Sequence, residues 1–227
     1  MDSPRRTAVL LGILLLVSFV FGVLSSIPAL EDPDYLTLLF GIELQVLSAI
    51  FSQVTMSVAY TGIAVLFYPL LKNYNEQLAA GYLAFRIIGA GFLFAGIGAL
   101  ILLLWLSKSF FDAGLPDVSH FQTAGELLRQ GRDILNHIGM IMPWSIGGLI
   151  LYYCLYRTVL IPRWLAVWGM IGSASTLIAT VLLMLKIIPL IDPVYFFLNA
   201  PIAFGELLLA FVLIVHGFNS HPTYTEV

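Results

Sequence analysis

The stretch VYFFLNAPIAFGELLLAFVLIVHGF, residues 194–218, decides the fold of this chain. It is long enough for a transmembrane helix, which needs about 20 apolar residues to cross roughly 30 Å of hydrocarbon. Its only charged residue is Glu206, near the middle. A charged side chain at that depth costs on the order of 3 kcal/mol, so such residues usually face the interior of a helix bundle and have a partner there. Glu206 is therefore the first residue to explain.

The rest of the chain repeats this apolar pattern. Of its 227 residues, 60% are hydrophobic and 10% are charged, and the mean hydropathy is +0.98. An average soluble domain has roughly 25% charged residues, so this composition cannot cover a water-facing surface. The sequence predicts an all-α integral membrane bundle of six transmembrane helices. Besides residues 194–218, the evidence is five windows without any charge, at 7–30, 44–71, 87–107, 134–156 and 164–185.

We expect one transmembrane domain over residues 1–227, because the connections leave no room for a separate soluble domain. Lys and Arg concentrate on the cytoplasmic side of membrane proteins. With the N-terminus inside, six of them lie inside and four outside, so we expect both termini in the cytoplasm. The predicted spans are about 7–29, 41–69, 78–106, 134–156, 163–185 and 194–218.

The outer connection over residues 107–133 is the only long one. Between Phe121 and Leu135, apolar and charged residues alternate at helical spacing, which is typical of an amphipathic helix at a membrane interface. This segment could lie on the outer membrane surface, cover the mouth of the bundle as a lid, or extend the fourth span as a solvated helix. We favour the extension.

Aromatic residues lie near several predicted helix ends. Such amphipathic rings settle at the headgroup depth of a bilayer. We interpret seven of them as interface anchors, namely Trp105, Trp144, Trp164, Trp168, Tyr152, Tyr153 and Tyr156.

Several function classes find little support. No cluster of basic residues is present to neutralise nucleic-acid phosphates. The single cysteine, Cys154, excludes an intrachain disulfide and any multi-cysteine metal site. His120 and His137 are weak candidates for a metal at the outer mouth with an aspartate such as Asp133, but their spacing follows no recognised pattern. We expect no cofactor, and the absence of a nucleophile-elbow serine argues against an enzyme.

Polar residues in two predicted spans share helical faces. In the sixth span, Asn199 and Glu206 lie about two turns apart on one face. Small and hydroxylated residues often serve only to let membrane helices pack closely. Gln53 is different, because a large amide near the midplane has four hydrogen-bonding positions to satisfy. The second span has a stripe at steps of three and four that we expect to face the interior, formed by Gln45, Ser48, Ser52, Thr55, Ala59 and Gly62.

Depth along the helices selects a partner for Glu206. Glu206 lies near the middle of the sixth span, and Arg86 lies roughly five residues below the middle of the third. This difference in depth is about 7 Å, which an arginine side chain can reach. A buried Arg86–Glu206 ion pair is one interpretation. The other is a protonated Glu206 that shares a hydrogen bond with Gln53 or a serine, because burial disfavours the charged form. The candidate ligand-binding residues are therefore Glu206, Arg86, Gln53 and Asn199.

Three segments together resemble a known family. They are LYRTVLIPRWL at 155–165 with the Trp-Gly pair that follows, YPLLK at 68–72 leading to Arg86, and the closing part with Pro201 and Glu206. The chain resembles domain of unknown function family 4386, a set of bacterial multispan membrane proteins. In that family's pattern an acidic residue follows the arginine by three positions, and Gly89 stands there in this sequence. The resemblance implies a multi-pass protein of the bacterial inner membrane, but no biochemical activity.

Two classes of function remain open, with a membrane-embedded enzyme third. The first is a small transporter or small-molecule-binding membrane protein, whose partners are the lipid bilayer and a small-molecule or ion ligand near Glu206. The second is a non-catalytic structural or partner-binding membrane subunit, in which buried polar groups only fix the packing of the helices. The first requires a cavity that reaches Glu206 from one side, and the second requires that residue to be packed shut.

Overall fold

The structure is a computed structural model that describes residues 3–113 and 118–219, and these residues form helices with no strand among them. Six helical segments in these ranges are long and apolar enough to cross a membrane, so the predicted all-α class and the six spans are confirmed. Residues 114–117 of the expected outer connection lie outside the described ranges. Five of the six segments are α1 (Ser3–Leu24), α3 (Glu43–Lys72), α4 (Glu76–Asp112), α7 (Arg163–Met184) and α8 (Pro193–Val215).

The sixth segment is a continuous run of three helices. The α-helix α5 (Val118–Asp133) leads into the π-helix η2 (Ile134–Met140), and α6 (Ile141–Thr158) follows without a break. The amphipathic segment is therefore an extension of the fourth span in this structure. A single π-turn inside an α-helix is rare and often occurs at functional sites.

Local sequence signals set several helix ends. Asn75 begins α4, because its side chain accepts a hydrogen bond from the Leu78 amide at 2.9 Å. Asp192 begins α8 in the same way, and Pro193 follows at the position where proline costs a helix least. Val159, in a left-handed conformation with φ of 54°, ends α6, so the chain can turn back into α7.

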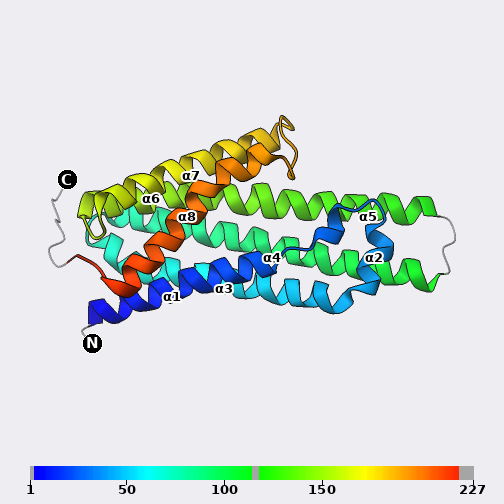
Figure 1. Cartoon of the computed structure of the whole chain (residues 1–227), viewed down its shortest axis with the longest axis horizontal. Helices are drawn as coiled ribbons and strands as arrows, with labels where there is room; N and C mark the ends of the chain where they lie inside the picture. The colour runs from blue at the N-terminus through cyan, green and yellow to red at the C-terminus, as the bar shows by residue number, and fades with distance from the viewer. Residues whose placement is uncertain (1–2, 114–117, 220–227) are drawn as a thin grey trace.

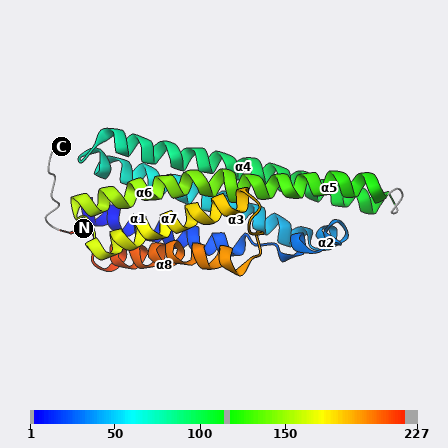
Figure 2. The ribbon, with the colours of Figure 1, turned by 90° about the horizontal axis from the view of Figure 1, so that it is seen from above.

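The six segments pack side by side in a closed ring, in the order α1, α3, α4, α6, α7, α8 and back to α1. Figures 1 and 2 show this bundle from two directions, with the first and last described residues at one end. We call this the terminal end, and it is held by Arg5, whose guanidinium donates to the carbonyls of Leu213, Ile214 and Val215. A cation suits the end of a helix where backbone carbonyls lack partners.

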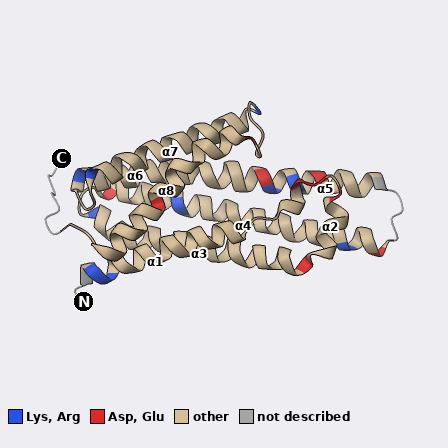
Figure 3. Ribbon diagram, in the orientation of Figure 1, with Lys and Arg blue, Asp and Glu red and all other residues tan. Residues whose placement is uncertain are grey.

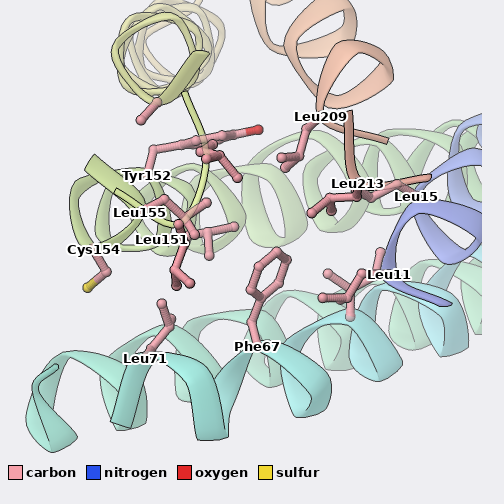
Figure 4. Close-up of a cluster of buried hydrophobic side chains, with 14 of the residues drawn as sticks. Leu11, Leu15, Phe67, Leu71, Leu151, Tyr152, Cys154, Leu155, Leu209 and Leu213 are labelled. Carbon is pink, nitrogen blue, oxygen red and sulfur yellow. The ribbon is translucent and has the colours of Figure 1, made fainter. Parts of the chain in front are cut away.

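A packed apolar cluster fills the ring at the terminal end, and we call it the plug. Figure 4 shows side chains from α1, α3, α6 and α8 converging there. Tyr152 is 1% exposed within it, so its interpretation as an interface anchor is wrong. The space is filled because the neighbouring helices of the ring all present large apolar side chains at the same depth along the bundle. Among the most buried are Leu11, Phe67, Leu71, Tyr82, Leu155 and Leu213.

The opposite end, which we call the far end, extends past the bilayer. The helix α4 has 37 residues, and at about 1.5 Å per residue its length of roughly 55 Å exceeds the 30 Å of hydrocarbon. The short helices η1 (Pro28–Glu31) and α2 (Tyr35–Gly41) join α1 to α3 here, and α2 packs on α4. Arg129 of α5 pairs with Glu126 at 2.9 Å and with Glu31 at 3.7 Å. Charged residues lie mainly toward the two ends of the bundle (Figure 3).

Candidate functional site

The structure places Arg86 and Glu206 together inside the ring. Nη2 of Arg86 lies 4.0 Å from Oε1 of Glu206, and the two side chains are 5% and 15% exposed. The other carboxylate oxygen of Glu206 accepts a hydrogen bond from the Tyr60 hydroxyl at 2.6 Å. A buried charge needs such partners, because the surrounding lipid supplies none. The structure therefore has the buried ion pair, and Tyr60, rather than Gln53 or a serine, donates the hydrogen bond to Glu206.

Three aromatic rings surround the Arg86 guanidinium. Its central carbon is 5.1 Å from the ring centre of Tyr60, 5.6 Å from that of Tyr82 and 5.8 Å from that of Trp144. The faces of such rings attract a cation, which offsets part of the cost of burying it. Trp144 also donates from Nε1 to the Arg86 carbonyl at 3.0 Å. Its indole lies inside the bundle, so the interpretation of Trp144 as an interface anchor is wrong.

The packing around position 89 explains why a glycine stands there. A Cβ atom there would collide with the Trp144 indole ring. Any side chain at Gly89, including the acidic one of the family pattern, would displace that ring from its place beside Arg86. The carboxylate beside Arg86 comes from Glu206 of α8.

A cavity of about 360 Å³ lies against this ion pair. Its walls are mostly apolar, and its volume falls in the range of small-molecule sites. Asn199 also borders the cavity, and its side-chain nitrogen Nδ2 donates to the Tyr195 carbonyl at 2.8 Å. All six spans contribute to the lining, with Ser18 from α1, Tyr60 from α3, Arg86 from α4, Trp144 from α6, Ser173 from α7 and Glu206 from α8. The cavity is therefore central to the ring.

A second cavity, of about 300 Å³, continues toward the far end. The two share Gly22, Met56 and Met140 as wall residues, so they meet at the level of the π-helix. Gln53 lines the second cavity, so it is separate from Glu206. Asn136, from the π-helix, lines it as well.

Polar groups without partners cluster around these two cavities. Burial of an unsatisfied polar atom costs on the order of 1–3 kcal/mol, so each one calls for an explanation. Among the described residues, eight buried side-chain atoms have no hydrogen-bond partner. Six of the eight belong to residues that line one cavity or the other: Gln53, Arg86, Arg132, Asn136, Ser173 and Thr176.

The candidate metal ligands do not converge on one point. His137 lies in the π-helix, where its Nδ1 is 3.2 Å from the Tyr195 hydroxyl, and His120 lies near the start of α5. Within residues 3–113 and 118–219, no group of three or more His, Cys, Asp or Glu side chains could hold a metal ion. The structure gives these histidines no common site.

Tyr60 was not among the residues predicted for the site, and the stripe predicted to face inward in the second span is correct only in part. Ser52 and Ala59 of that stripe are buried, and Thr55 and Gly62 are half-buried. Gln45 and Ser48 of that stripe are exposed, whereas Val46 and Ala49 are buried. The face that borders the cavities consists of Gln53, Met56 and Tyr60, at steps of three and four. A tyrosine two turns from a buried glutamine was the available signal, but its direction depends on which neighbours α3 packs against.

Six apolar spans arranged around a buried ion pair define a multi-pass membrane protein. A family model described as domain of unknown function (DUF4386) matches residues 10–217, so the chain belongs to this family, as the sequence motifs indicated. No curated protein and no solved structure matches the chain.

Proposed function

We propose that this protein is a small transporter or small-molecule-binding membrane protein that takes its ligand into the cavity beside Glu206. The observation that carries the proposal is the asymmetry of the ring. The cavity reaches the Arg86–Glu206 pair and continues toward the far end, whereas the plug closes the terminal end. A binding site at the level of the apolar spans that is packed closed toward one side of the membrane is what one state of an alternating-access transporter requires.

The open space argues against a purely structural subunit. If Arg86 and Glu206 served only to fix the packing of the helices, the ring would close around them as it does around Phe67 in the plug. Instead, the ion pair and the hydroxyl-bearing residues Ser173 and Thr176 border a cavity. A ligand or water in that space can hydrogen-bond to Glu206, whose side chain is 15% exposed.

The distribution of charge supports a location and an orientation. Arg5, Lys72, Arg157 and Arg163 all belong to the terminal end of the bundle. Since Lys and Arg are retained on the cytoplasmic side, we place both termini in the cytoplasm and the cavities toward the outside. This topology fits one transmembrane domain in the cell membrane, the inner membrane in a bacterium.

The accessibility of a thiol in the cavity tests the proposal. Ala203 lines the cavity and its side chain is partly exposed, so Ala203→Cys in a Cys154→Ala background introduces a thiol with little disturbance. The wild-type protein is the matched control, because its single cysteine is fully buried in the plug. We expect N-ethylmaleimide to modify the introduced thiol at least about tenfold faster than Cys154, since thiol reactivity follows exposure.

The reaction is followed by intact-protein mass spectrometry on the purified protein in detergent. Equal, slow modification of both thiols would mean that the ring is packed shut around Glu206. That outcome would overturn the proposal in favour of a structural or partner-binding subunit.

A further inference from the structure

The gap between Arg86 and Glu206 has the right size for one ligand oxygen. Their nearest charged atoms are 4.0 Å apart, whereas a direct hydrogen bond between such groups measures about 2.7–2.9 Å. An oxygen at about that distance from both atoms would have an angle of roughly 90° between its two contacts, which a hydroxyl group accommodates. A hydroxyl can also play both roles, since it accepts from the guanidinium and donates to the carboxylate.

The charges of the site favour an uncharged headgroup. Arg86 and Glu206 neutralise each other, so the pair offers no excess charge to a carboxylate or an ammonium group. A charged ligand would lose its hydration in a mostly apolar cavity, and an acid would also face Glu206 while an amine would face Arg86. A hydroxyl loses less on desolvation and gains two hydrogen bonds to charged groups.

The walls of the cavity favour a ligand with an apolar body and indicate that it enters from the bilayer. Near the terminal end, α1 and α8 touch closely, because Gly12 lets Ile214 and the Ala210 carbonyl approach. Toward the far end the two helices diverge (Figure 1). There the cavity is lined by α1 and α8 residues that are partly exposed on the outside of the ring, and Val23 is 63% exposed. The cavity thus opens sideways between α1 and α8 at the level of the apolar spans.

We infer that the ligand is an uncharged amphiphile dissolved in the bilayer, with an alkyl or isoprenoid body and a hydroxyl headgroup. It enters between α1 and α8, and its hydroxyl bridges Arg86 and Glu206. This inference rests on the proposed function, because it names the class of ligand for the same cavity. The apolar body replaces lipid contacts with contacts to wall residues such as Met56, Met140 and Ile202.

Trp144 provides a reporter for this binding, because its ring borders both the cavity and Arg86. The remaining tryptophans, Trp105, Trp164 and Trp168, are exposed on the outside of the ring and are replaced by Phe to leave a single fluorophore. The protein is reconstituted in lipid nanodiscs and titrated with three probes of equal chain length that carry bromine on the fifth carbon, near enough to the headgroup to contact Trp144: 5-bromodecanol, 5-bromodecanoate and 5-bromodecylammonium. Bromine quenches tryptophan fluorescence on contact, so a probe in the cavity gives saturable quenching.

We expect saturable quenching by the alcohol at a mole fraction in lipid at least about tenfold below that needed for the acid or the amine. Ala203→Phe, which places a ring in the cavity, should abolish the saturable component. Leu208→Phe is the matched control, because this residue lies on the exposed side of α8 and should leave the quenching unchanged.

The outcomes separate this inference from the proposed function. Saturable quenching by the acid or the amine, with none by the alcohol, would overturn the hydroxyl assignment while the cavity still binds a ligand. If no probe gives saturable quenching but the Ala203→Cys thiol reacts quickly, the cavity is accessible and the amphiphile class is wrong. Slow reaction of that thiol would overturn the proposed function itself.

Discussion

The two halves of the ring are built from the same helices, yet only the half at the terminal end is packed solid. On α3, Phe67 and Leu71 are fully buried among apolar side chains of the plug, whereas Tyr60, two turns earlier, borders an open cavity. On α8, Ala210 is fully buried against α1, and Glu206, one turn earlier, borders the same cavity. Hydrophobic content alone therefore does not decide whether membrane helices close on one another.

What distinguishes the halves is the fit of the side chains across the ring. Small residues such as Gly12 let two backbones meet at the plug, and large side chains fill the remainder. At the level of the ion pair, Arg86 occupies the centre with three rings around it, so the helices cannot approach as closely. The cavity lies at this level, where α1 and α8 diverge.

The largest expected effect comes from emptying the plug. Phe67→Ala removes a ring that is 0% exposed, and such a change costs about 4 kcal/mol through lost contacts and the void that remains. Phe51→Ala, on the same helix but 65% exposed, should cost less than about 1 kcal/mol. Unfolding of both variants by sodium dodecyl sulfate in mixed micelles measures the difference. Equal losses would show that the plug is no denser than the lipid-facing surface.

The next effect concerns the charges beside the cavity. Glu206→Gln leaves Arg86 without its counter-charge, and we expect a loss of about 3 kcal/mol, at the low end for a broken buried pair because the cavity admits some water. Arg86→Met should cost less, since a carboxylate can be neutralised by a proton whereas a guanidinium stays charged. The same denaturation assay on both variants and on their combination gives the coupling energy. Full additivity would mean that the two groups do not interact.

The smallest effect compares two glycines of α1. A Cβ at Gly12 would lie 2.6 Å from an Ile214 carbon and 2.8 Å from the Ala210 carbonyl, so Gly12→Ala should destabilise by about 2 kcal/mol. A Cβ at Gly22, beside the cavities, would meet only the flexible Met56 sulfur at 3.2 Å, and Gly22→Ala should change stability by less than about 1 kcal/mol. Thermal unfolding in detergent is sensitive enough to rank them. A Gly22→Ala variant as damaged as Gly12→Ala would contradict a loosely packed far half.

Several features of the site could be predicted from residue counts along the chain. Arg86 was identified as the partner of Glu206, because depth in a helix follows directly from sequence distance. Tyr60 and the second cavity at Gln53 were not identified, because they depend on how α3 is rotated about its own axis. Trp144 was assigned to the interface for the same reason, since an aromatic residue near a predicted span end fits both lipid headgroups and a buried cage around a cation.

The sequence by itself determined the helical class and the six spans. In lipid, each apolar segment must satisfy its backbone hydrogen bonds internally, so a charge-free window of sufficient length has to form a helix. Only the tertiary structure decided which face of each helix turns inward, where the ring is packed solid and where it stays open. The physical reason is that lipid chains and protein interiors are equally apolar, so a leucine or phenylalanine has no preference between them, and only the fit between neighbouring helices settles its direction.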